Sequence, residues 1–324
     1  MFDIISIGDS TLDAFFGLDE KDAQVLCDLN KEDCIICFRY ADKIPAKSFT
    51  RVPAAGNAAN NAVGSARLEM RSAIYTILGT DDIGRDVAKT FDKEGVEKKY
   101  IVWDEVHGSN VSVVLNYKGE RTIFVYHQPR IYSWPTDFGP TKWVYYTSMG
   151  KEHYTLHEPL ENYVSQNSVS LVFNPGSWQL KEGINVLSKI MKFCHLFIVN
   201  REESEKLVGQ GEIKDLLKKL AGFGPKIVII TDGPAGSYSF DGQKFYKLGI
   251  LDCPIVERTG AGDSYATALV AALFYGKSLQ DAMVWGTINS ASVIQKIGPQ
   301  AGLLTKAEIE RIVSENPNLK AEEF

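Results

Sequence analysis

The residues RTGAGD, Arg258 to Asp263, run directly into SYATALVAALFYG, a segment of small and apolar residues at positions 264–276. The glycines at 260 and 262 let the backbone approach a ligand, and a helix that begins here points its first N–H groups and its positive dipole end at that ligand. Asp263 suits a helix start and is also a carboxylate beside the bound anion, where it can accept a proton from an attacking hydroxyl. Spacing alone fits an anion site and an ordinary glycine turn before a helix equally well.

Two better-known phosphate motifs do not fit this part of the chain. The segment GAGDSY at 260–265 lacks the third glycine of a dinucleotide fingerprint and lies far from the first strand. Gly276-Lys277-Ser278 resembles the end of a Walker A loop, but Ala271 stands where its first glycine belongs, and Gly276 is better explained as a helix C-cap. The sequence therefore disfavours a Rossmann dehydrogenase and a P-loop enzyme.

Upstream of RTGAGD, short apolar runs alternate with helical stretches. Strands are predicted near 143–147, 170–173, 196–199 and 227–231, each followed by a helix-compatible segment, and an earlier strand at 3–7 ends at Gly8. This alternation predicts a parallel sheet covered by helices on both faces, closed by helices at about 263–275 and 279–296. Residues 14–50, with a helical patch around 19–29, and a hairpin at 109–126 are predicted as excursions from that core.

With these elements in order, the chain resembles the ribokinase-like (PfkB) carbohydrate kinase family over nearly its whole length, and RTGAGD is similar to that family's second signature. The resemblance implies an α/β fold with a three-layer α/β/α core around a mostly parallel sheet. It also implies a small β lid, expected from segments of about 14–50 and 107–128 within one domain of residues 1–324. Asp263 would be the catalytic base, and Gly260, Ala261 and Gly262 would form the anion hole.

The resemblance also assigns substrate-binding residues in the N-terminal half. Asp13 closes the segment GDSTLD at 8–13, where the family's first strand ends and an acid binds substrate hydroxyls. A carboxylate just past the end of a strand also lies where open α/β sheets bind ligands. Residues 55–60, AGNAAN, are similar to the family's sugar-binding glycine pair, although Ala55 replaces the first glycine and narrows either backbone freedom or pocket volume. The further candidates for substrate contacts are Gly56, Asn57 and Asn60.

Nucleotide-binding residues follow from the same resemblance. Asn200 and Glu203 match the family's Asn-x-x-Glu element, which implies that they organise phosphate and Mg²⁺, with Glu203 acting through water, because magnesium commonly keeps several waters. Glu257 stands where many members have an aspartate that helps to bind a monovalent cation, which leaves a role for K⁺ open. Further ATP contacts are expected from Thr231, Gly233 and Gly236 in the loop TDGPAG, and from Asn289 near the adenine pocket.

These residues predict a kinase that uses ATP and Mg²⁺ to phosphorylate a hydroxyl of a monosaccharide or related polyol. The rival within the family is a nucleoside kinase, whose base would need an aromatic or apolar slot; Phe15, Phe16, Tyr126 and Trp178 are available for one. A rival of another class is a catalytically silent nucleotide-binding regulator, which the intact RTGAGD motif disfavours.

Composition disfavours other kinds of partner. A net charge of −6, a pI near 5.5 and the lack of a Lys/Arg cluster argue against nucleic acid. No apolar run in the sequence is long enough to span a bilayer, and the first residues do not resemble a signal peptide, so we expect no membrane partner and a cytoplasmic protein. Exposed strand edges tend to be covered, which allows a homodimer through the lid.

Cysteine and histidine patterns do not indicate a metal site. Five cysteines in a chain of this size fit reduced thiols. Cys34 and Cys37 have zinc-like spacing, but no second pair accompanies them, and residues 34–38 are better explained as a buried strand. His153 and His157 would face together on a helix, but they lack the intervening glutamate of a zinc protease motif, and we expect them on the surface.

Overall fold

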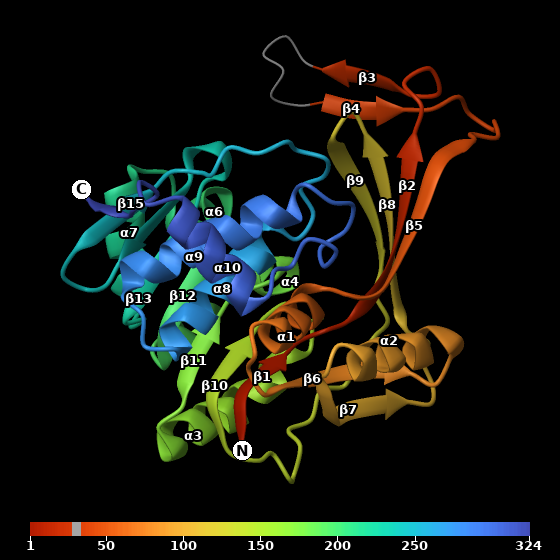
Figure 1. Ribbon diagram of the computed structural model, residues 1–324. Helices are drawn as coiled ribbons and strands as arrows, with labels where there is room; N and C mark the ends of the chain where they lie inside the picture. Colours follow the sequence, from red (N-terminus) through yellow and green to blue (C-terminus); the bar gives the residue numbers. More distant parts are fainter. Residues whose placement is uncertain (28–33) are drawn as a thin grey trace.

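A ten-stranded sheet runs through the larger part of the molecule (Figure 1). The computed structural model describes residues 1–27 and 34–324. The strands from β7 to β13 in the spatial order are parallel, and three antiparallel strands extend the sheet beyond β13, which confirms the predicted mostly parallel sheet. In that order the strands are β16 (Glu322–Glu323), β15 (Phe245–Leu248), β14 (Ser237–Phe240), β13 (Ile227–Thr231), β12 (Cys194–Asn200), β11 (Ser170–Phe173), β10 (Thr141–Tyr146), β1 (Phe2–Ile7), β6 (Ser72–Gly79) and β7 (Glu97–Asp104).

Helices cover both faces of this sheet, because its central strands are apolar on both sides. Along β1, Ile5 and Ile7 pack into one buried cluster, whereas Ile4 packs into the cluster on the other face. The first face carries α3 (His157–Asn167), α4 (Ser177–Glu182), α5 (Ile184–Met191), α6 (Arg201–Val208) and α7 (Ile213–Ala221). The second carries α1 (Asn57–Arg67), α2 (Asp82–Lys93), α8 (Ala261–Phe274), α9 (Leu279–Val293) and α10 (Lys306–Glu315). The predicted three-layer α/β/α core is therefore present.

A separate four-stranded sheet stands off the core, and we call it the lid sheet after the role predicted for it (Figure 1). In spatial order it contains β5 (Ala46–Ala55), β2 (Thr11–Leu18), β8 (Asn110–Tyr117) and β9 (Glu120–Tyr126). β8 and β9 form the predicted hairpin, and its turn residues Lys118 and Gly119 have φ of 52° and 83°, as a tight two-residue turn requires. The lid sheet thus draws its strands from both predicted lid segments, although residues 28–33 of the first segment lie outside the described residues.

A small hairpin of β3 (Gln24–Cys27) and β4 (Cys34–Cys37) lies beyond the lid sheet and corrects three predictions. Residues 24–27 form a strand, not the end of a helical patch; positions 28 and 29 of that patch are not among the described residues. Cys27 lies opposite Cys34 and forms a disulfide with it, so the expectation of reduced thiols is wrong for this pair. β4 is a strand as predicted, but it is not buried: Ile35 is 57% exposed, because the hairpin stands at the tip of the molecule.

The expectation that His153 and His157 lie on the surface is also wrong. They occupy the short helix η1 (His153–Leu156) and the first position of α3, and both are buried. His153 Nδ1 lies 2.9 Å from the Tyr146 hydroxyl and 3.1 Å from His157 Nε2, and its Nε2 lies 2.8 Å from Glu182. Burial lowers the pKa of both histidines to about 4, so at neutral pH they serve as uncharged hydrogen-bonding residues of the core.

Candidate active site

The RTGAGD loop folds into the start of α8, as the sequence predicts. Gly260 caps the helix with φ of 81°, and a Cβ at this position would lie 2.4 Å from Pro299 Cβ, so only glycine fits. A Cβ added to Gly262 would meet no atom within 4 Å, which shows that this residue faces open space. The Ala261 N–H donates to the Arg258 carbonyl at 3.3 Å. The start of α8 therefore presents a positive dipole end toward the space in front of Gly262.

Asp263 lies in the first turn of α8 and meets a residue of α1. Its Oδ2 accepts a hydrogen bond from Asn60 Nδ2 at 2.7 Å, and Asn60 Oδ1 in turn accepts one from Gln300 Nε2 at 3.0 Å. Burial raises the pKa of Asp263, while the Asn60 hydrogen bond and the positive charge of Arg121 act in the opposite direction. Asn60, 203 positions away in the chain, thus holds the Asp263 carboxylate in a fixed orientation.

The loop between β1 and β2 and the start of β2 carry several buried polar groups without partners. Among the described residues, Asp9 Oδ1, Ser10 Oγ and Asp13 Oδ1 are buried and make no hydrogen bond. Asp9 Oδ2 accepts from the Tyr132 hydroxyl at 2.8 Å and from the Gly150 N–H at 3.0 Å. Unsatisfied buried polar atoms are costly unless a ligand pairs with them, and three of them within five residues fit a ligand that carries hydroxyls.

The carboxylates of Asp9 in the loop and of Asp13 in β2 hold protons more tightly than usual. Burial raises the pKa of Asp9 to about 6. Burial also raises the pKa of Asp13 to about 6, partly offset by hydrogen bonds from Ser112 and Thr11, while the charges of Asp263 and Glu257 raise it further. Asp13 was predicted as a substrate residue, whereas Asp9 and Ser10 were not, although they belong to the same GDSTLD segment. Their only signal was their position after the first strand.

The turn at Gly56 brings the start of α1 to this loop. Gly56 has φ of 93°, and a Cβ there would lie 2.8 Å from the Asp9 carbonyl oxygen, so a side chain is excluded. Ala55 before it is fully buried as the last residue of β5, paired with Thr11, a conformation that alanine adopts without strain. Asn57 opens α1, and Asn60 follows one turn later. The turn therefore brings the predicted substrate residues Gly56, Asn57 and Asn60 beside the loop that leads into β2, the strand that carries Asp13.

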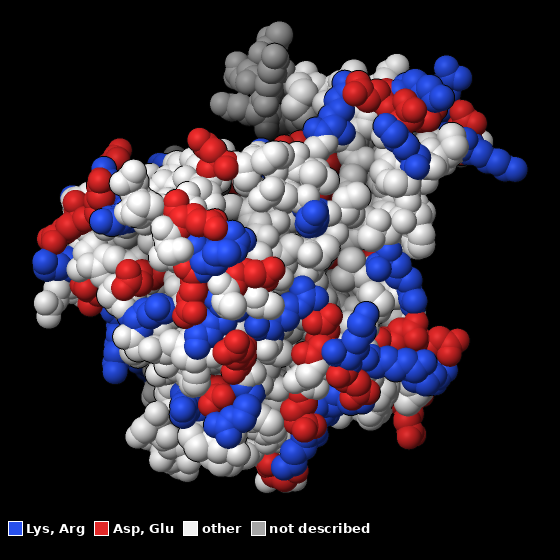
Figure 2. Space-filling model, in the orientation of Figure 1, with Lys and Arg blue, Asp and Glu red and all other residues white. Residues whose placement is uncertain are grey.

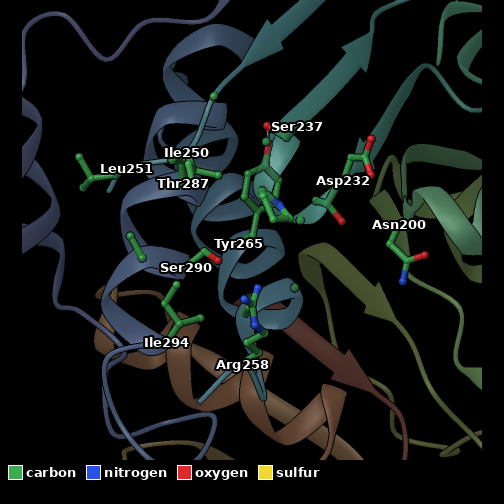
Figure 3. Close-up of a pocket in the computed structure, with 18 of the residues that line it drawn as sticks. Asn200, Asp232, Ser237, Ile250, Leu251, Arg258, Tyr265, Thr287, Ser290 and Ile294 are labelled. Carbon is green, nitrogen blue, oxygen red and sulfur yellow. Dashed lines mark hydrogen bonds between the residues drawn. The ribbon is translucent and has the colours of Figure 1, made fainter. Parts of the chain in front are cut away.

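A cavity of about 690 Å³ lies beside the RTGAGD loop. In Figure 3, Thr287 and Ser290 of α9 and Ile294, which follows that helix, form one side, Asn200 and Asp232 the other, and Tyr265 and Arg258 lie between them. Six of the predicted residues line it: Ala261, Gly262, Asn200, Thr231, Gly233 and Gly236. Apolar residues from the loop after β15, such as Ile250, Leu251 and Ile255, complete it. Sequence reasoning missed these, because an irregular loop carries no periodic signal.

Among the predicted catalytic and nucleotide-binding residues, Gly260, Asp263, Glu203 and Asn289 do not line the cavity. Glu203 caps α6 reciprocally with Asn200: each backbone N–H donates to the other's side-chain oxygen at 2.8 Å. Burial raises the pKa of Glu203. Asn289 is fully buried and ties α8 to the chain before α10, with Nδ2 donating to the Ser264 carbonyl at 2.9 Å and Oδ1 accepting from Leu304 N–H at 3.0 Å. Asp263 borders the cavity through its neighbour Gly262.

Glu257 joins two loops. It is 2% exposed, its Oε1 accepts hydrogen bonds from the Thr259 N–H at 2.7 Å and from the Thr259 hydroxyl, and its Oε2 lies 3.4 Å from the Gly298 nitrogen. Arg258 turns away from it and lies 3.8 Å from Glu120 of the lid sheet. The Glu257 carboxylate therefore already has donors on both oxygens, so the structure supplies no specific support for a cation there.

The described residues contain neither a cluster of metal ligands nor a helix able to span a membrane. Within residues 1–27 and 34–324, no cluster of three or more His, Cys, Asp or Glu side chains could hold a metal ion. A magnesium ion carried by ATP needs only one or two protein carboxylates, so Glu203 beside Asn200 fits such an ion. Over the same residues, no helix is both long enough and apolar enough to cross a membrane.

Comparison with known proteins places this arrangement in a wider context. The family model for pfkB family carbohydrate kinases matches residues 25–306. Ribokinase from Staphylococcus aureus is 22% identical over 89% of this chain and 98% of its own length. A 5-dehydro-2-deoxygluconokinase from Bacillus subtilis is 23% identical over 80% of this chain and 86% of its own length.

Solved structures with the same fold include two kinases. Arabidopsis thaliana ribokinase, solved with ribose and ATP, superposes with a TM-score of 0.78 at 18% identity, covering 96% of this chain and 98% of that one. A nucleoside kinase from Methanocaldococcus jannaschii gives a TM-score of 0.74 at 19% identity, with 97% and 99% covered. At these identities the likeness establishes the ribokinase-like fold.

Proposed function

Because this chain belongs to the pfkB family of carbohydrate kinases, which makes it a phosphotransferase with a hydroxyl acceptor, we propose that it transfers the γ-phosphoryl group of ATP to a monosaccharide or related polyol. One observation carries the proposal. Asp263 lies where the cavity beside Gly262 meets the Asn60 and Asp13 side of the sheet edge. A carboxylate at that junction can contact the acceptor hydroxyl and adjoin the phosphoryl donor.

The reaction requires a base and a stabilised anion. The acceptor hydroxyl oxygen forms a bond to the γ-phosphorus, the bond to the β-phosphate oxygen breaks, ADP leaves, and the hydroxyl proton passes to Asp263. Asn60 orients the carboxylate through its 2.7 Å hydrogen bond. The start of α8, at residues 260–262, directs its positive dipole end at the charge on the transferring group. Asn200, Thr231, Gly233 and Gly236 would contact the nucleotide, with Asn289 supporting the cavity wall from behind.

Two cations bear on this chemistry. Mg²⁺, when bound with ATP, neutralises the phosphate charges, and Asn200 and Glu203 would hold its water shell. K⁺ is a weaker proposal, because Glu257 already accepts hydrogen bonds from Thr259 and lies near the Gly298 N–H. Comparing turnover in K⁺ and in a large organic cation tests the K⁺ role.

The acceptor is best proposed as a polyhydroxy compound. Asp9, Ser10 and Asp13 leave three buried oxygens without partners, and hydroxyl groups are suitable partners for them. The nucleoside alternative needs an aromatic slot, but the four aromatic residues considered for it are dispersed. Phe15 is buried, Phe16 packs on Phe49 on the opposite face of the lid sheet, and Tyr126 and Trp178 are exposed.

The lid sheet also has surface available for a second copy of the chain. β9 lies at its edge and is exposed throughout, with Phe124 58% and Tyr126 63% exposed. Figure 2 shows few charged side chains over the middle of the lid. A homodimer through this strand would cover the exposed edge of the lid sheet. Within each copy, the core and the lid sheet together would act as one kinase domain of residues 1–324. Light scattering with a Phe124→Glu variant tests the dimer, which the variant should dissociate.

The experiment that tests the proposed function is ADP release with Mg·ATP across ribose, fructose, 2-keto-3-deoxygluconate, adenosine, cytidine and inosine, with and without K⁺. Turnover on a sugar and not on nucleosides is the expected result. Turnover on a nucleoside alone would show that the substrate is a nucleoside and not a sugar. ATP binding without turnover on this or a wider panel would favour a non-catalytic regulator.

A further inference from the structure

Strand register defines which side chains of the lid sheet face the core. Residues paired directly across a sheet point to the same side. Asp13 pairs with Ser112, and Ser112 pairs with Val125, which belongs to the same strand as Arg121 and is separated from it by an even number of positions. Because side chains alternate along each strand, Arg121 points to the same side as Asp13. Arg121 is therefore on the face of the lid sheet that carries the proposed substrate residue.

Arg121 reaches the cavity of the core from this face. Its side chain is one of the groups that line the 690 Å³ cavity, together with Arg258, Gly262 and Asn200. Its positive charge also influences Asp263, whose pKa it lowers. Among the described residues, no other member of the lid sheet lines this cavity. The guanidinium therefore lies between the proposed base and the proposed nucleotide site.

Among the described residues, the guanidinium of Arg121 has no carboxylate partner. Within the described part of the chain its side chain makes no ion pair and no hydrogen bond, whereas its neighbour Glu120 lies 3.8 Å from Arg258 in the RTGAGD loop. That contact places the start of β9 over the start of α8. An arginine that points into a cavity beside a helix N-terminus, with no anion to neutralise it, is suited to bind a phosphate brought by a ligand.

We propose that Arg121 binds the terminal phosphate of ATP from the lid side, opposite the backbone N–H groups of the RTGAGD loop. This inference rests on the proposed function and deepens it. The guanidinium donates to oxygens of the γ-phosphate and neutralises part of the charge that spreads over them when the group is transferred. Since Arg121 is supplied by the lid sheet, the terminal phosphate also holds the lid sheet against the core.

The test compares nucleotides that differ only in the terminal phosphate. Calorimetry measures the affinity of wild type, Arg121→Met and Arg121→Lys for Mg·ADP and for a non-hydrolysable Mg·ATP analogue. We expect Arg121→Met to lower the affinity for the ATP analogue roughly 10- to 100-fold, the range for a lost hydrogen bond between charged groups. The affinity for ADP should fall by less than about 3-fold. Arg121→Lys should fall between, because it keeps the charge and loses the two-pronged geometry.

A matched control is Arg39→Met, which removes the same charge from an exposed arginine that lies before β5 and away from the cavity. It should bind both nucleotides as wild type does. Thermal unfolding of Arg121→Met should match that of the control, because Arg121 is exposed and makes no ion pair among the described residues.

Two results would overturn the inference and leave the proposed function intact: equal affinity of Arg121→Met and wild type for the ATP analogue, or an equal loss for ADP and the analogue. The first would show no phosphate contact, and the second would show that the contact is not to the terminal phosphate. If wild type bound neither nucleotide, the proposed function itself would be wrong, and this inference with it.

Discussion

Replacement of Asp263 by asparagine should abolish most turnover and leave the fold unchanged. Asparagine has the same shape, and its side-chain oxygen can still accept the hydrogen bond that Asn60 donates at 2.7 Å. It cannot take the proton of an attacking hydroxyl. General base catalysis contributes about 10²- to 10⁴-fold, so the barrier should rise by about 3 to 5 kcal/mol at 1.36 kcal/mol per decade.

The free energy of unfolding of Asp263→Asn, unlike its turnover, should not fall. Burial raises the pKa of Asp263, so the folded protein favours the neutral acid and the charged form destabilises it at pH 7. The asparagine side chain of the variant is neutral at every pH. The free energy of unfolding of Asp263→Asn should therefore equal or exceed that of wild type at neutral pH, and the difference should disappear below about pH 4, where the unfolded acid is also protonated.

The assay is ADP release at saturating ATP and acceptor over pH 5 to 9, with chemical denaturation of the same samples. A matched control is Asp281→Asn, which makes the same change in the first turn of α9, where Asp281 only contributes to a helix cap with Ser278. The control should keep turnover. Near-normal turnover of Asp263→Asn would refute the role of base, and lost turnover with a lower free energy of unfolding would show that the change acts through the fold.

Three further outcomes are expected. Asn60→Ala should lower kcat and move the acid limb of its pH profile to higher pH, because the Asn60 hydrogen bond lowers the pKa of Asp263; an unmoved limb would contradict this coupling. Asp9→Asn should remove a pH-dependent contribution of about 3 kcal/mol to the free energy of unfolding, because the pKa of Asp9 is about 6 in the folded protein against an ordinary value of 3.8. In wild type this contribution is fully present below pH 3.8 and is lost as the pH rises through about 6. Parallel denaturation profiles of variant and wild type over pH 4 to 8 would exclude it. Gly260→Ala should cost stability and nucleotide affinity together, because φ of 81° and the 2.4 Å approach to Pro299 leave no room for a methyl group; an unchanged melting temperature would show that the loop can move.

The sequence was most informative where physical constraints are local. Strands such as β11 and β13 are short, continuous apolar runs, buried on both faces, and such runs can be recognised in the sequence. The RTGAGD loop needs a glycine at 260 because its φ is positive and Pro299 is close, and that requirement is visible in the chain itself. The core and the start of α8 could therefore be predicted.

Features that depend on distant partners could not be predicted from the chain alone. The histidines at 153 and 157 read as surface residues because their partner Glu182 is 29 positions away from His153 and belongs to another helix. The pairing of Cys27 with Cys34 depends on the register of β3 and β4, which sequence spacing does not fix. Arg121 showed no motif, and only the register of the lid sheet brings it to the cavity.

The lid sheet is joined to the core through the residues proposed to bind substrate. β2 begins at Thr11, four residues after β1 ends at Ile7, and β5 is separated from α1 by Gly56 alone. Tilting the sheet about these short connections acts as a lever: it displaces Asp13 at one connection and Asn57 at the other. Closure of the lid sheet and contact with the substrate would then occur in one movement. Binding of the acceptor would therefore shift the position of β9 through the backbone connections.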